Sequence, residues 1–179
     1  MADMTQAPQK KSTLDTVANI AIIVVCAIAA VVLIRNQFFP AQPRVPGAQA
    51  QVEKGERFDQ LKAVMPAGSN RALVVAVSPT CHFCNDSMPF YKKLIDQRNQ
   101  QGSQVKVIAA VPSEEAKAEE SKKFASAGAN PDGLVLVDFC TVKVPGTPTL
   151  LLVDNDGKVL NVWVGKQDEK GEKEILEVL

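Results

Sequence analysis

The feature that most constrains this chain is an apolar run that ends in a pair of closely spaced cysteines. Residues 73–77 read Leu-Val-Val-Ala-Val, and the run stops at Ser78-Pro79. Cys81 and Cys84 follow, and the segment after them has helical spacing. A strand that turns into a helix carrying Cys-x-x-Cys on its first turn is the layout of a redox dithiol. The pattern therefore predicts a strand–turn–helix unit that presents two thiols.

Charge and histidine content exclude several functional classes. The 179 residues carry 20 basic and 20 acidic side chains, so the net charge is zero and nothing supports nucleic-acid binding. His82 is the only histidine, and it lies between the two cysteines. A zinc site needs more ligands than this triplet offers, and the haem-attachment pattern Cys-x-x-Cys-His is broken here by Asn85. We therefore expect neither a metal nor another cofactor.

Residues 16–34 form an uncharged apolar stretch that predicts a transmembrane helix. At 1.5 Å per residue, such a stretch spans roughly the ~30 Å hydrocarbon core of a bilayer. A cleaved signal peptide is the alternative, with residues 48–50 as its cleavage site, but the apolar run is longer than usual for one. Two lysines precede the stretch and two arginines follow it, so the charge count does not decide the orientation. We expect an uncleaved anchor with a cytoplasmic N-terminus and an extracytoplasmic domain.

The anchor divides the rest of the chain into three parts. Residues 1–15 are a short polar tail. Residues 35–51 contain three prolines and no hydrophobic period, which is typical of an extended tether. Residues 52–179 are then long enough to form a domain with its own hydrophobic core.

Within this domain, apolar periodicity predicts alternating strands and helices followed by a hairpin. Strands are expected over 72–77, 105–111, 134–137, 149–153 and 159–164, and helices over 57–65, 81–101, 113–127 and 168–179. Pro89 falls inside the second of these helices and is expected to kink it. The residues 154–157, Asp-Asn-Asp-Gly, are a strong turn signal between the last two strands. This order predicts an α/β fold whose sheet is parallel in one part and antiparallel at one edge.

With these elements placed, residues 52–179 resemble the thioredoxin superfamily. The resemblance rests on the Cys-His-Phe-Cys sequence of 81–84, on Pro89 five residues later, and on Gly-Thr-Pro-Thr at 146–149 before an apolar strand. It implies a thioredoxin-like fold, a mixed central sheet flanked by helices. It also implies that Thr147 and Pro148 are joined by a cis bond and help to bind the substrate backbone.

One branch of that superfamily is the closest resemblance, namely the TlpA/ResA-like membrane-anchored thiol–disulfide oxidoreductases. The predicted anchor and tether point to it, and so do the 67 positions (148 − 81) between Cys81 and Pro148. This spacing is longer than in a minimal thioredoxin. The additional residues contain a helix–strand unit over 114–137 that is similar to the central insert of this branch. Cys140 lies just upstream of the proline loop, and we expect it to be a buried structural cysteine.

Four positions depart from the superfamily pattern. Thr80 stands where thioredoxins carry a tryptophan, and Val75 stands where they carry a buried aspartate. His82 and Phe83 replace the usual Gly-Pro between the cysteines. The sequence therefore does not identify the residue that accepts the proton in the resolving step, and it does not predict the reduction potential of the site.

Position along the helix separates the expected roles of the two cysteines. Cys81 would meet free backbone N–H groups and the positive end of the helix dipole, which favour the reactive thiolate. Cys84, one turn further in, is expected to be more buried and to act as the resolving thiol. His82 either tunes the thiolate together with Phe83 or is simply an exposed polar residue.

These patterns predict a membrane-anchored thiol–disulfide oxidoreductase that acts on proteins in a bacterial periplasm or on the outer face of the membrane. Reduction of protein disulfides is the expected direction. A disulfide-forming oxidase of the same fold uses the same chemistry, and a non-catalytic redox-sensing or binding module is an alternative of another class. The expected partners are protein thiols and disulfides, together with a membrane electron donor or acceptor.

Overall fold

The computed structural model describes residues 22–25, which are helical, and residues 51–179. The chain divides into two units, Met1–Pro46 and Gly47–Leu179, and the sheet belongs to the second. Among the described residues, no helix is long and apolar enough to cross a membrane. The predicted anchor over 16–34 lies outside the described residues apart from 22–25, and the predicted tail and tether lie outside them apart from residue 51.

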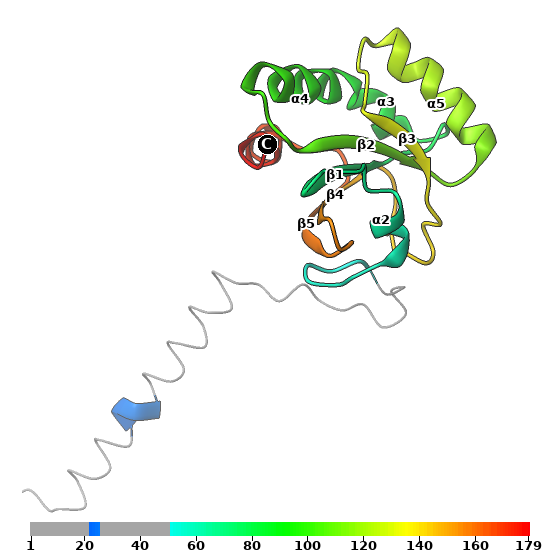
Figure 1. The fold of residues 1–179 in the computed structure, drawn as a ribbon. Coiled ribbons are helices and arrows are strands. Elements are labelled where there is room, and N and C mark those ends of the chain that lie inside the picture. The colour runs from blue at the N-terminus through cyan, green and yellow to red at the C-terminus, as the bar shows by residue number, and fades with distance from the viewer. Residues whose placement is uncertain (1–21, 26–50) are drawn as a thin grey trace, which may run out of the picture. The chain divides into compact units, whose positions relative to one another are not determined.

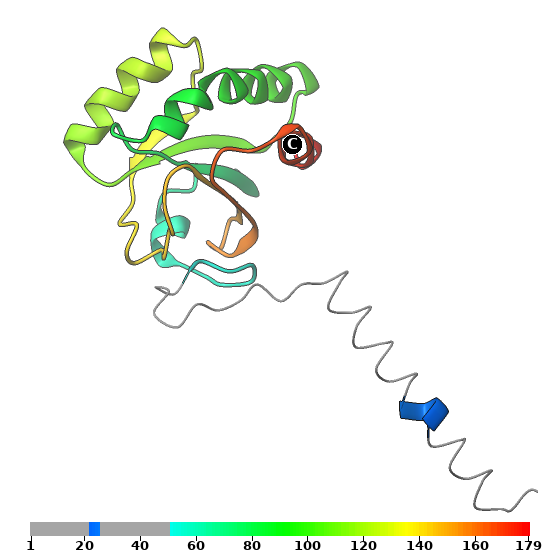
Figure 2. The same ribbon diagram turned by 180° about the vertical axis from the view of Figure 1, so that it is seen from behind.

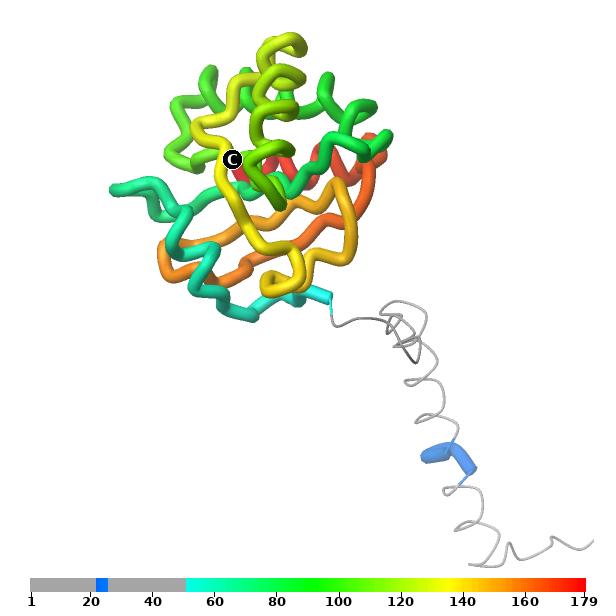
Figure 3. The backbone as a smooth tube through the Cα atoms, turned by 90° about the vertical axis from the view of Figure 1, so that its right-hand side faces the viewer, coloured from blue at the N-terminus to red at the C-terminus, as the bar shows by residue number. Residues whose placement is uncertain are grey.

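A five-stranded sheet forms the centre of the second unit (Figure 1). Its strands are β1 Arg71–Ala76, β2 Lys106–Val111, β3 Gly133–Leu136, β4 Thr149–Asp154 and β5 Val159–Val164. They lie in the order β3-β2-β1-β4-β5, with β1, β2 and β3 parallel and β4 and β5 antiparallel to their neighbours. Figure 3 shows β4 and β5 as a hairpin in orange. The predicted mixed sheet is confirmed.

The central strand β1 is apolar from Ala72 to Ala76, with no polar residue at alternate positions. Both of its faces can therefore be buried, and they are. Side chains alternate across a strand, so Leu73 and Val75 enter one core while Ala72 and Val74 enter the other. Both cores therefore continue to the end of β1, where the cysteine segment begins.

Helices cover both faces of the sheet. They are α2 Asp59–Ala63, α3 His82–Asp86, α4 Met88–Gln101, α5 Glu114–Ser126 and α6 Glu169–Glu177. Buried side chains of α4, α5 and α6, including Tyr91, Phe124 and Ile175, share one core with Leu73. Leu61 of α2 belongs to the other core. Consequently α2 lies across the sheet from α4 and α5, as Figures 1 and 2 show.

The helix predicted over 81–101, with a kink at Pro89, is interrupted at Ser87. The structure has two helices, with Ser87 as the C-cap of α3 and the N-cap of α4. Pro89 lies in the first turn of α4, where its missing N–H costs no hydrogen bond. The expected disturbance at Pro89 is therefore present as a break two residues earlier, and it leaves α3 as a short helix that has Cys81 as its N-cap and contains Cys84.

Candidate active site

Cys81 and Cys84 form a disulfide at the N-terminus of α3, with a Cα–Cα distance of 5.3 Å. Cys81 is the N-cap residue, and its Sγ accepts a hydrogen bond from the backbone N–H of Cys84 at 3.0 Å. Cys81 is half-buried, whereas Cys84 is fully buried. An incoming molecule would therefore meet the sulfur of Cys81 first.

A short turn aims Cys81 after the end of β1. The backbone N–H of Cys81 donates to the carbonyl of Ser78 at 3.0 Å, and α3 begins at the next residue. Free N–H groups at a helix start and the positive end of its dipole stabilise a thiolate. The N–H of Cys84 already points at Cys81 Sγ, so the same donor is in place when the disulfide is reduced.

The loop before β4 lies against the disulfide. Thr147 and Pro148 are joined by a cis peptide bond, and the carbonyl oxygen of Thr147 is 3.1 Å from Cys81 Sγ. The sulfur of a disulfide has no proton, so this becomes a hydrogen bond only in the reduced thiol. The hydroxyl of Thr149 donates to the carbonyl of Gly146 at 2.7 Å, and the N–H of Gly165 donates to the carbonyl of Pro148 at 2.7 Å. The loop is thus held in place from both sides.

When the chain is compared with known proteins, the proteins that match it are ones with solved structures. No family model and no curated protein matches the chain. A protein from Chlorobium tepidum with the provisional name thiol:disulfide interchange protein DsbE matches with a TM-score of 0.52 and 21% identity, over 71% of this chain and 98% of that one. This match and the order of the five strands decide the fold. The chain has a thioredoxin-like fold.

Two further solved structures are similar to smaller extents. A secreted Mycobacterium tuberculosis disulfide oxidoreductase matches with a TM-score of 0.47 and 14% identity, over 62% of this chain and 82% of that one. The thioredoxin domain of a Bacteroides vulgatus thiol-disulfide oxidoreductase matches with a TM-score of 0.48 and 13% identity, over 75% of this chain and 98% of that one.

The thioredoxin-like fold brings together four of the six residues that the sequence singled out. Cys81, Cys84, Thr147 and Pro148 meet between α3 and the start of β4. Their roles in exchange and substrate binding remain predictions.

The other two residues, His82 and Phe83, point to solvent. The His82 side chain is 81% exposed, and its Nε2 lies 3.6 Å from a carboxylate oxygen of Asp86, which also pairs with Lys166 at 3.3 Å. Phe83 is 56% exposed, so its ring is open to solvent next to Cys84.

One contact of the cysteine segment was not predicted from the sequence. Lys123 of α5 donates a hydrogen bond to the carbonyl of Pro79 at 2.6 Å, across 44 positions of sequence. Lys123 stands among charged helix residues that look solvated, so the sequence carries no signal for this contact.

The expected burial of Cys140 is wrong, because its side chain is exposed and unpaired in the described part of the chain. It lies in the turn after β3, where its backbone N–H donates to a carboxylate oxygen of Asp138 at 3.0 Å. The hydroxyl of Thr141 donates to the same carboxylate at 2.6 Å. An Asx-type turn such as this holds the backbone locally, so the cysteine side chain is not needed in the core.

An ion pair ties the start of the described domain to the segment before the proline loop. Lys143 pairs with a carboxylate oxygen of Glu56, and its carbonyl accepts from the N–H of Val52 at 2.9 Å. The hydrogen bond from Lys143, with a smaller contribution from the backbone of Glu53, holds the pKa of Glu56 below its ordinary value of 4.5. Residues 52–56 are thereby fastened to the segment that leads into Thr147.

This pair predicts a pH dependence of stability. A carboxyl whose pKa is lower in the folded state stabilises the fold above its unfolded pKa and loses that contribution as the pH falls through the folded value. We therefore expect Glu56→Gln to destabilise the protein at neutral pH and to cost progressively less below about pH 4.5. Urea unfolding at neutral and acidic pH measures the difference. Glu119→Gln, at an exposed position, is the matched control, and an unchanged Glu56→Gln effect at low pH contradicts the prediction.

Proposed function

We propose that this protein is a membrane-anchored thiol–disulfide oxidoreductase that reduces disulfides of extracytoplasmic proteins. The observation that carries the proposal is the Cys81–Cys84 disulfide at a helix N-terminus, with the Thr147 carbonyl against the sulfur of Cys81. The added α5–β3 unit at the sheet edge supports the TlpA/ResA-like type, since it matches the insert expected for that branch.

The exposure of the two sulfurs sets the order of events. The Cys81 thiolate attacks one sulfur of the substrate disulfide, a Cys81–substrate bond forms, and the other substrate sulfur leaves as a thiolate. Cys84, which is buried next to it, then attacks the Cys81 sulfur and releases the second substrate thiol. Two electrons pass from the dithiol to the substrate, and the enzyme is left with the disulfide that the structure contains.

The surroundings of Cys81 support a protein as the substrate. Phe83 offers an exposed apolar side chain, and the half-buried Thr147 belongs to a loop that offers backbone groups. An extended peptide around a disulfide presents the same two kinds of group, apolar side chains and backbone amides. A membrane electron donor would restore the dithiol after each cycle.

The direction of electron flow is tested by the reduction potential of the Cys81–Cys84 pair. Thioredoxin-type reductants lie near about −270 mV and strong oxidants near about −120 mV. We expect a value near the first, measured by equilibrating the full-length protein in detergent with glutathione or dithiothreitol buffers. A value near the second would make the protein a disulfide-forming oxidase.

The predicted anchor over 16–34 and the outward orientation are part of the proposal and have their own test. The free thiol of Cys140 is exposed, so it serves as a reporter in a Cys81→Ser/Cys84→Ser variant. We expect the protein to stay with membranes after a carbonate wash, and a membrane-impermeant maleimide to label Cys140 in spheroplasts. Labelling only after lysis would place the domain in the cytoplasm.

A further inference from the structure

Glu120 is a fully buried carboxylate on α5. Its neighbours on the buried face of that helix, Ala116 and Phe124, both belong to the core that contains Cys84. Among the described residues neither carboxylate oxygen has a hydrogen-bond partner, and the one ion pair is with Lys123 at 3.3 Å. A charged side chain is rarely buried without a strong reason, because removal from water is costly.

Lys123 connects this carboxylate to the cysteine segment. Its side chain is 31% exposed, and its Nζ donates to the carbonyl of Pro79 at 2.6 Å. Pro79 lies inside the turn in which the N–H of Cys81 donates to the carbonyl of Ser78. The ammonium group of Lys123 is therefore shared between a buried anion and the turn that aims Cys81.

This arrangement has two consequences for a thiolate at Cys81. It holds the turn still, which keeps the N–H of Cys84 directed at Cys81 Sγ. It also places the positive end of the ion pair nearer to the turn, because the Lys123 ammonium bonds to the Pro79 carbonyl whereas neither oxygen of Glu120 makes a hydrogen bond within the described residues, and the nearer charge has the larger effect. Both effects favour the thiolate, so they act in the same direction.

We propose that the Glu120–Lys123 ion pair is a positioning device that fixes the Ser78–Pro79 turn and stabilises the Cys81 thiolate. The inference rests on the proposed dithiol chemistry and extends it to the α5–β3 unit, whose helix supplies both residues. Glu120 acts through Lys123 and touches no reacting atom.

The test removes both charges together, because loss of Lys123 alone would leave an unpaired buried carboxylate. The variant is Glu120→Gln/Lys123→Met in the full-length protein. The same helix offers a matched control, Glu119→Gln/Lys122→Met, since these residues have the same spacing on its exposed face. Lys123→Arg keeps the charge and is the rescue variant.

Two readouts separate positioning from a merely structural role. The first is the equilibrium of the dithiol with glutathione, in which we expect the double variant to favour the disulfide about tenfold more than the wild type, or ~30 mV. The second is the pH profile of Cys81 alkylation, followed by mass spectrometry of its peptide, which should shift to higher pH. His82, Asp86 and Lys166 are the other titratable groups at α3, and Tyr91 of α4 is a buried one whose pKa is raised by burial and also by the Glu120 charge; all four are unchanged in every variant.

The control pair and Lys123→Arg should match the wild type in both readouts. Should the Gln/Met variant fail to fold, Glu120→Leu/Lys123→Met fills the site with apolar side chains, a replacement that is often neutral or stabilising. Wild-type values for either double variant, or equal shifts in the control pair, would overturn the inference. Because both readouts concern the dithiol itself, they stand apart from the search for a protein substrate.

Discussion

Replacing Cys84 by serine should turn this protein into a trap for its substrates. The Cys81 thiolate would still attack a substrate disulfide, but a serine hydroxyl does not resolve the mixed disulfide. Cys84 is fully buried beside Cys81, so no external thiol reaches the same position as easily. We expect turnover to vanish and covalent adducts through Cys81 to accumulate, seen on non-reducing gels and identified by mass spectrometry.

The controls for this trap use the other thiols of the domain. Cys81→Ser/Cys84→Ser should form no adducts, because the attacking sulfur is gone. Cys140→Ser combined with Cys84→Ser should trap as well as Cys84→Ser alone. Cys140 is exposed, so adducts that disappear in this combination would assign the reactivity to Cys140 and refute the proposed role of Cys81.

The second large effect is expected at Gly157 in the β4–β5 turn. Its φ is +74°, a region that costs an L-residue roughly 1–2 kcal/mol. A Cβ here would also press on the carbonyl oxygen of Phe58 and lie 2.7 Å from the backbone nitrogen of Lys62. Overpacking of this kind typically costs about 1–3 kcal/mol more. We therefore expect Gly157→Ala to lower the free energy of unfolding by about 2–5 kcal/mol in urea titrations.

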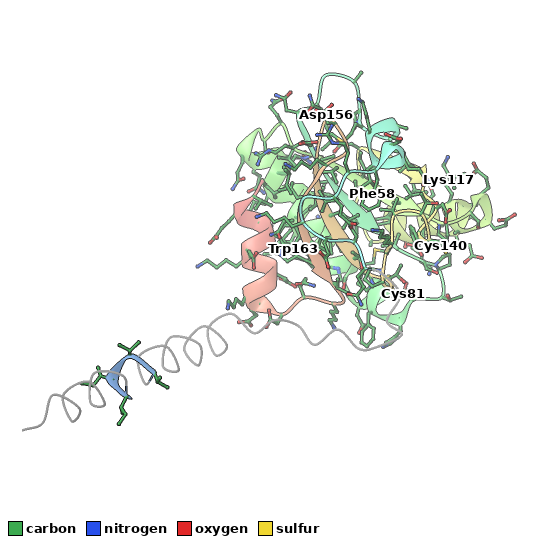
Figure 4. The ribbon with its side chains drawn as sticks, turned by 90° about the horizontal axis from the view of Figure 1, so that it is seen from below. Phe58, Cys81, Lys117, Cys140, Asp156 and Trp163 are labelled. Carbon is green, nitrogen blue, oxygen red and sulfur yellow. A yellow bond between two sulfur atoms is a disulfide. The ribbon has the colours of Figure 1, made fainter. Side chains whose placement is uncertain are left out.

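Gly68 is the matched control for this change. Its φ is +77°, but an added Cβ would meet nothing within 4 Å. Gly68→Ala should therefore show only the backbone cost, and equal losses in the two variants would contradict the proposed clash with α2. Asp156, in the same turn as Gly157, lies at the far end of the domain from Cys81 (Figure 4), so the reduction potential of folded Gly157→Ala should stay unchanged.

Local patterns account for the parts of the fold that could be predicted. The apolar run of β1 and the Asp154–Gly157 turn are each formed by residues adjacent in the chain, and both appear as predicted. Pro89 shows the limit of such a rule, because a proline in a helical stretch either kinks the helix or starts a new one. In the structure a new helix, α4, starts just before Pro89. Its N-cap Ser87 is buried, as is Cys84 in the preceding helix.

The sequence by itself determined the dithiol and the strand–turn–helix unit that presents it, because spacing and periodicity are local properties. Only the tertiary structure decided what meets Cys81. Thr147 comes from 66 positions away, and Lys123 reaches Pro79 across 44 positions. The exposure of Cys140 was decided in the same way. Such contacts depend on the order of the strands and on which face of a helix is buried. The residues next to the site determine neither of these.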